Sequence, residues 1–354
     1  MDRSSVKYFV LLTCIFFILP MQLFCQKPEF TRQDTLRGSI TPERAWWDLT
    51  YYHLDITVNP SDSTIRGTNT VMYKVVSSYK TMQIDLQEPM KLTNAVMNDK
   101  ALSFKREGNV YWIDIIEKQE QGKIYSVILT FGGKPKVSTR PPWVGGITWK
   151  KDKNGLPFVA SACQGDGASL WWPCKDHMYD EPDSMLISVN VPENLIDVSN
   201  GRLRNIVKLK NKTKTYNWFV ANPINNYGVN INIADYVHFS EIFNGEKGPL
   251  DCDYYVLNED LEKAKLQFKQ VPMMLTAYEH LFGPYPFYED SYKLVEAPYL
   301  GMEHQSSVTY GNGFKNGYRG TDLSSSGWGL KFDFIIIHES GHEWFANSIT
   351  YEDI

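Results

Sequence analysis

Residues 334–345 read FIIIHESGHEWF, and the five letters HESGH at positions 338–342 decide how the rest of the chain is interpreted. In an α-helix, residues four apart lie about 40° apart around the axis, so His338 and His342 face the same side. Glu339 is offset by about 100°, which places its carboxylate beside a bound metal rather than on it. The H-E-x-x-H pattern therefore predicts a Zn²⁺ site with His338 and His342 as ligands and Glu339 as the catalytic base.

The residues around this pattern favour a buried helix. An apolar run at 334–337 precedes it, and Trp344 and Phe345 are expected to continue the apolar face. The alternative is a pair of core histidines with ordinary hydrogen-bond partners. Phe345 and Ser348 stand where one zinc class carries Gly and a third His, so the third ligand is expected to be an acidic residue farther downstream.

Upstream of the pattern, apolar residues recur at helical spacing between 261 and 282. Pro272 is expected to kink or restart this helix, and Gly283-Pro284 to end it. Stripes of this kind usually face a protein core, so we assign no chemistry to them.

Between Trp46 and Tyr236 the sequence alternates apolar and polar residues in short runs. In the first run, Leu54, Ile56 and Val58 are expected to share one face. The expected strands lie at 52–58, 68–76, 82–86, 110–116, 124–131, 185–191, 216–220 and 229–233. This pattern predicts an all-β saddle or sandwich. The period changes near residue 240, so we expect a β domain over 26–240 and a partial catalytic domain over 241–354.

The first 25 residues are expected to be a signal peptide. Arg3 and Lys7 precede an apolar run at 8–19, which is short for a membrane span of about 20 residues. An uncleaved signal anchor and a lipoprotein attached at Cys25 are the alternatives. We therefore expect export to the periplasm, the cell surface or the medium, with membrane association only if the segment is retained.

Composition bears on the expected partners and on the state of the cysteines. The 354 residues carry a net charge of −5 without a basic stripe, so a nucleic-acid partner is not expected. Beyond the N-terminal segment only Cys163, Cys174 and Cys252 remain, and an odd number argues against a disulfide framework. We expect buried free thiols, with a Cys163–Cys174 bridge as the alternative.

A second motif makes the chain resemble a known family. Residues 301–305 read GMEHQ, and Glu303 lies 35 residues before His338. This stretch resembles the Gly-x-Met-Glu-Asn element of zinc aminopeptidases related to aminopeptidase N, which are gluzincins. The resemblance implies a multidomain chain, with an N-terminal all-β saddle followed by the start of an α+β thermolysin-like catalytic domain.

The resemblance also implies roles for individual residues. Glu303 would hold the free ammonium of a peptide substrate, which requires a fixed carboxylate one residue from the metal. Gly301 and Met302 would line the substrate backbone. His304 departs from the family's usual Asn.

A third segment begins at Cys163-Gln164-Gly165 and ends near residue 183. It is similar to the family's segment in which a glutamine of the β domain reaches the first substrate subsite, and Gln164 is the matching position. His177 and the acidic residues near it could bind a metal, but a turn and a domain contact are expected instead.

The resemblance implies a zinc-dependent aminopeptidase that releases N-terminal amino acids from peptides by means of a metal-activated water. In the family, the third zinc ligand is a Glu farther along than residue 354, followed by a Tyr that stabilises the oxyanion. We therefore expect a fragment or a truncated gene product, and the activity of this chain alone stays open. The alternatives are a related zinc hydrolase with epoxide hydrolase activity and a non-catalytic peptide-binding protein.

Overall fold

The structure is a computed structural model that describes residues 29–350. The expected signal peptide at 1–25 and the last four residues lie outside the described range. The chain divides into two compact units, residues 1–35 and 36–354, and the second contains all the described strands. Helix α2 (Arg32–Gly38) crosses that division. Within residues 29–350, no helix has both the length and the apolar character that crossing a membrane requires.

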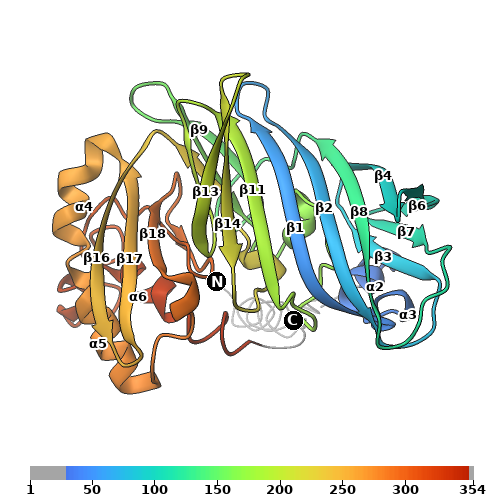
Figure 1. The fold of residues 1–354 in the computed structure, drawn as a ribbon. Helices are drawn as coiled ribbons and strands as arrows, with labels where there is room; N and C mark the ends of the chain where they lie inside the picture. Colours follow the sequence, from blue (N-terminus) through green and yellow to red (C-terminus); the bar gives the residue numbers. More distant parts are fainter. Residues whose placement is uncertain (1–28, 351–354) are drawn as a thin grey trace, which may run out of the picture. The chain divides into compact units, whose positions relative to one another are not determined.

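The largest element is an eight-stranded sheet (Figure 1). Strand β1 (Trp47–Asn59) lies inside it and pairs parallel with β11 and antiparallel with β2. Leu54, Ile56 and Val58 are buried and Asp55 is exposed, which confirms the predicted face. The other strands, in spatial order around β1, are β13 (Arg202–Leu209), β14 (Thr213–Val220) and β11 (Ser184–Pro192) on one side, and β2 (Thr64–Val75), β8 (Ile124–Gly133), β4 (Lys91–Met97) and β5 (Lys100–Ala101) on the other.

Two smaller sheets share one hydrophobic core with the large sheet. Ile56 of the large sheet, Ile84 and Ile233 all belong to this core. The saddle or sandwich predicted from the alternating runs is therefore confirmed. The smaller sheets consist of β3 (Thr81–Asp85), β7 (Val110–Asp114) and β6 (Phe104–Glu107), and of β12 (Ile196–Val198), β15 (Asn232–Ala234), β10 (Pro157–Ala162) and β9 (Gly146–Lys151).

The rest of the chain forms a five-stranded sheet with helices packed on it, around a second core (Figure 1). Its strands in spatial order are β16 (Tyr236–Gly245), β17 (Gly248–Leu257), β18 (Tyr292–Glu296), β20 (Val308–Tyr310) and β19 (Gly301–Met302). Its helices are α4 (Leu261–Gln267), α5 (Gln270–Phe282) and α6 (Phe334–Gly341). This α+β region is the predicted start of a catalytic domain. The predicted boundary at residue 240 lies inside β16, and its exact place stays a prediction.

Short helices and breaks complete the second unit. Pro272 is the third residue of α5, so it follows the break between α4 and α5 and restarts the helix. Helix α3 (Pro42–Ala45) precedes β1. Single-turn 3-10 helices lie at Ala168–Leu170, Asn226–Gly228, Asn258–Asp260, Tyr288–Asp290 and Trp328–Leu330.

The three cysteines of the described chain are buried free thiols. Burial raises the pKa of Cys163 and of Cys174, which makes both unreactive at neutral pH. The expectation of small buried residues is confirmed, and the alternative bridge between Cys163 and Cys174 is not formed.

A buried ion pair ties α3 to the segment that carries Gln164. Arg44 Nη2 lies 2.7 Å from Asp85 Oδ2, and both side chains are almost fully enclosed. The same Asp85 carboxylate accepts a hydrogen bond from the backbone N–H of Asp176 at 3.0 Å. Removing one partner of a buried pair leaves an uncompensated charge, which is far more costly than losing an exposed pair.

We predict that Asp85→Ala lowers the free energy of unfolding by about 3–5 kcal/mol, because it strands the buried Arg44 guanidinium. Glu117→Ala is the control, since it breaks an exposed pair with Lys100 and should cost less than about 1 kcal/mol. Urea denaturation followed by tryptophan fluorescence measures both. Equal losses in the two variants would contradict the role given to the buried pair.

Candidate metal centre and substrate cleft

Helix α6 carries the H-E-x-x-H pattern and begins at a capping aspartate. The carboxylate of Asp333 accepts hydrogen bonds from the backbone N–H groups of Ile335 at 3.0 Å and Ile336 at 3.5 Å. It therefore satisfies two of the donors that the first turn of a helix leaves unpaired. Ile335 and Ile336 are buried in the second core, so the helix is fixed by its cap and by its apolar face.

The predicted ligands meet at the exposed end of this helix. The side-chain ligand atoms of His338, Glu339 and His342 all lie within 4.8 Å of one another. The two imidazole rings are 4.8 Å apart between centroids and nearly perpendicular. Two nitrogens that bind one zinc at about 2.0–2.1 Å are at most about 4 Å apart, so small side-chain rotations suffice. The residues therefore fit a Zn²⁺ ion.

Neighbouring groups orient both imidazoles. His342 Nδ1 lies 3.0 Å from the carbonyl oxygen of Phe345. A carbonyl only accepts, so Nδ1 carries the proton and Nε2 is left with a lone pair for a metal. The ring of His338 stacks on Phe334 with centroids 5.1 Å apart. Burial, and then the neighbouring His342, lower the pKa of His338, which keeps it in the neutral form that metals bind.

Glu339 lies on the inner side of the two histidines and is buried. Burial, and then the nearby negative charge of Glu303, raise its pKa well above the usual range of a carboxyl group. A carboxylate held in this way gains from accepting a proton, which suits a general base.

The helix ends sooner than the sequence predicts. It stops at Gly341, and His342 is its C-cap. Trp344 is buried, but the following Phe345 has 48% of its surface exposed. The expected continuation of the apolar face is therefore wrong for Phe345. The physical reason is the backbone, since the N–H groups of Asn347 and Ile349 bond to carbonyls five residues back, which turns the chain away from the helix axis.

Glu343, next to the second ligand, has a structural role. Its carboxylate is fully buried and accepts hydrogen bonds from Ser306 N–H at 2.9 Å and Tyr285 O–H at 3.1 Å. These bonds tie the turn after α6 to the loop after β19.

Gly301 is required where the outer strand β19 crosses α6. A Cβ atom at this position would lie 2.6 Å from Ile335 Cγ2 and 3.1 Å from Glu339 Cγ. Any larger side chain there would displace the side chains of Ile335 and Glu339. The strand that leads into Glu303 is therefore packed directly on the helix that carries Glu339, and Met302 is buried beside it.

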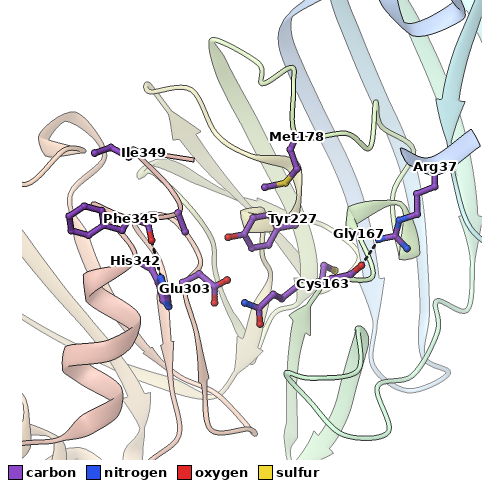
Figure 2. A pocket seen from close by; sticks show the side chains of 12 residues that line it. Arg37, Cys163, Gly167, Met178, Tyr227, Glu303, His342, Phe345 and Ile349 are labelled. Atoms are coloured by element: carbon purple, nitrogen blue, oxygen red, sulfur yellow. Dashed lines mark hydrogen bonds between the residues drawn. The ribbon is translucent and has the colours of Figure 1, made fainter. Parts of the chain in front are cut away.

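Glu303 and Gln164 come together at the metal centre from different regions. Both line a cavity of about 150 Å³ that also contains His338, Glu339 and His342. Both also line a second cavity of about 440 Å³, with Tyr227, Phe345 and Ile349 on its walls. Figure 2 shows the carboxylate of Glu303 pointing into this second cavity beside His342. The structure thus brings His338, Glu339, His342, Gly301, Glu303 and Gln164 to one cavity, whereas Met302 is buried in an apolar cluster and does not line it.

His304 does not take part in this cleft. It is fully buried, its Nδ1 lies 3.3 Å from the hydroxyl of Thr309, and burial lowers its pKa to about 3. His177 lies in a turn, where its Nδ1 accepts the backbone N–H of Tyr179 at 3.2 Å. In residues 29–350, the cluster of His338, Glu339 and His342 is the one group that could hold a metal.

Sequence reasoning missed several residues that shape the site. Trp143 and Tyr318 line the metal cavity, and Asp333 fixes its helix. Only Asp333 had a local signal, since an aspartate directly before an apolar helical run is a typical N-cap. Trp143 and Tyr318 reach the site through tertiary packing, which leaves no pattern in the sequence.

Known proteins resemble the chain in sequence and in fold. No family model matches the chain. Leucine aminopeptidase 2 of Vanderwaltozyma polyspora is 26% identical over 219 residues, which is 61% of this chain and 30% of that protein. The chain therefore spans less than a third of that relative's length.

Solved structures share the fold. A two-domain M1 zinc metallopeptidase bound to L-arginine aligns with a TM-score of 0.68 and 17% identity, over 89% of this chain and 67% of its own. An M1 zinc metallopeptidase mutant from Deinococcus radiodurans, bound to a Tyr-Ser-Ala substrate, aligns with a TM-score of 0.70 and 18% identity, over 90% and 69%. The fold implied by the sequence motifs is confirmed, and it is that of the M1 zinc metallopeptidases.

We predict that His338→Ala and His342→Ala each weaken Zn²⁺ binding by at least about 100-fold, since loss of even an outer partner of a ligand costs 10–100-fold. Glu339→Gln should change the affinity only a few-fold. His280→Ala, an exposed histidine of α5, is the control. Competition with a chromogenic chelator measures all four, and unchanged affinity in both ligand variants would exclude the site.

A second prediction concerns the cap of α6. Asp333→Ala should lower stability by about 1–2 kcal/mol for the lost cap and further for the donors left unpaired, and it should also weaken Zn²⁺ binding. Asp322→Ala is a matched control, because Asp322 caps only an exposed turn through Ser324 and Gly327. Thermal unfolding with and without Zn²⁺ separates the two variants. If Asp333→Ala and Asp322→Ala bound Zn²⁺ equally well, the cap would have no importance for the metal site.

Proposed function

We propose that this chain, which has the fold of the M1 zinc metallopeptidases, forms the metal site and the amine-binding cleft of a zinc-dependent aminopeptidase. The substrates would be peptides with a free N-terminus, from which the enzyme releases the first residue. Because the chain covers only part of its relatives, the proposal concerns the activity of the protein to which this site belongs.

The position of Glu303 carries the proposal. Its carboxylate is almost fully buried and shares a cavity with both predicted zinc ligands. No lysine or arginine forms an ion pair with it among residues 29–350. A buried carboxylate without a cation is costly, and a substrate ammonium would supply the missing charge. An exopeptidase needs this arrangement one residue from its metal.

The chain's own residues would carry out the remaining steps. A bound Zn²⁺ would lower the pKa of water and polarise the peptide carbonyl. Glu339 would accept the proton of the attacking water and pass it to the departing amine. Strand β19 is the outer strand of its sheet, so its backbone can pair with an extended peptide beside Gly301 and Met302. Gln164 would contact the substrate's first residue from the β region.

The amine-binding role predicts a specific loss of affinity. A tripeptide with a free N-terminus should bind the Zn²⁺-loaded protein roughly 10–100-fold more tightly than its N-acetylated form, as expected for a charge-assisted hydrogen bond. Glu303→Gln should remove this difference. The substitution and N-acetylation together should lower the affinity little more than either change alone. Isothermal titration calorimetry gives these affinities without requiring turnover.

The outcomes separate the alternatives. Equal binding of free and N-acetylated peptides would refute the amine anchor and favour another zinc hydrolase, including one that acts on epoxides. Peptide binding without stoichiometric Zn²⁺ would favour a non-catalytic peptide-binding protein. Turnover of an aminoacyl anilide that Glu339→Gln abolishes would establish catalysis by the chain itself.

A further inference from the structure

A third cavity adjoins the metal centre on the side away from Glu303. It has a volume of about 650 Å³ and shares Trp143 and Leu300 with the metal cavity. Gln164, Glu303 and His342 are instead the residues that the metal cavity shares with the cavity of Figure 2. The three cavities therefore follow one another, with the predicted zinc ligands in the middle one.

The charge of this third cavity is unusual for a chain with a net charge of −5. Its lining contains four cationic side chains and no acidic one. The cationic residues come from three separate segments and are Arg140, Lys150, Lys315 and Arg319. A hollow lined by one sign of charge concentrates its field and attracts the opposite charge.

These cations are not neutralised by the protein. Within the described residues 29–350, none of the four forms an ion pair with a carboxylate. Lys150 Nζ donates to the carbonyl oxygen of Pro298 at 2.8 Å, and the Arg140 guanidinium lies 5.7 Å from the centre of the Trp143 ring. Such contacts orient a cationic group without cancelling its charge.

The loop that carries Lys315 and Arg319 is fixed to the catalytic helix. The buried side chain of Asn312 donates to the carbonyls of Lys315 at 2.7 Å and Gly317 at 2.8 Å, and it accepts the N–H of Arg319 at 2.8 Å. The same Asn312 amide donates to Asp333, the cap of α6, at 2.8 Å. Asn312 therefore fixes the position of Lys315 and Arg319 relative to helix α6 and its candidate metal site.

The order of the cavities gives the cleft a polarity. On the proposed function, the substrate ammonium binds Glu303 and the scissile carbonyl lies at the histidines. The chain beyond the scissile bond then continues along β19 toward Leu300 and Trp143. This part of the substrate would therefore enter the third cavity, which is lined by the four cationic residues.

We propose that this cavity binds a carboxylate of the substrate that lies on the C-terminal side of the scissile bond. Two sources share this chemistry, the terminal carboxylate of a short peptide and the side chain of an acidic residue in a longer one. The cleft would thus recognise a peptide by a cation at one end and an anion at the other. This inference depends on the proposed function only for the direction of the peptide.

Calorimetric titration of the Zn²⁺-loaded protein tests the inference. Tri-alanine as the free acid should bind roughly tenfold more tightly than tri-alanine amide, and the difference should shrink as salt rises from 0.05 to about 0.5 M. Lys315→Gln combined with Arg319→Gln should remove the preference. Lys208→Gln combined with Lys210→Gln makes the same change in net charge on and beside strand β13, outside this lining, and should keep the preference.

Further peptides distinguish the source of the carboxylate and the two proposals. If Ala-Ala-Glu amide regains the affinity of the free acid, the cavity accepts an acidic side chain; if it does not, the cavity is specific for a chain terminus. Equal binding of acid and amide at low salt for all these peptides would overturn the inference. N-acetylation of the peptide tests Glu303 alone. If N-acetylation did not weaken binding, the aminopeptidase proposal would be refuted, but a preference for the free acid over the amide could still be observed.

Discussion

The carboxylate of Asp333 lies where the helices, the five-stranded sheet and a surface loop meet, and the geometry of the candidate site depends on the hydrogen bonds it accepts. Besides capping α6, it accepts from Tyr310 at 2.7 Å, Gln267 at 2.8 Å and Asn312 at 2.8 Å. Burial raises its pKa, and these donors oppose that effect. One charge therefore sets where the helix begins, how it sits on the sheet, and where the loop bearing Arg319 lies.

The β region supports the site from the other side. The hydroxyl of Tyr299, just before β19, donates to the carbonyl of Ser161 at 2.7 Å. The amide of Asn200 donates to the carbonyl of Gln305 at 2.7 Å, just after Glu303. A small apolar cluster that includes Ala160 and Met302 fills the space between them. Glu303 is thus held at both ends by hydrogen bonds to the β region, which explains how a residue in a loop can have a fixed carboxylate.

Electrostatics gives the cleft a direction. Glu339 and Glu303 are buried near each other, and such a pair destabilises the protein unless cations approach. A metal and a substrate ammonium would supply them. Beyond Leu300 the walls become cationic, with Lys315 and Arg319 exposed to solvent. Opposite charges at the two ends of one cleft favour a single orientation of a peptide, because the reverse orientation places like charges together.

Local spacing and residue chemistry are enough to predict part of this structure. The four-residue spacing of His338 and His342 places both imidazoles on one side of a helix, and the alternating runs specify strands. The tertiary structure alone decided which distant groups reach that helix. Gln164 and Trp143 come from segments with no helical or strand period, and their positions depend on packing between two cores. The early end of α6 at Gly341 likewise coincides with backbone bonds from Asn347 and Ile349 to carbonyls five residues back, which no local pattern encodes.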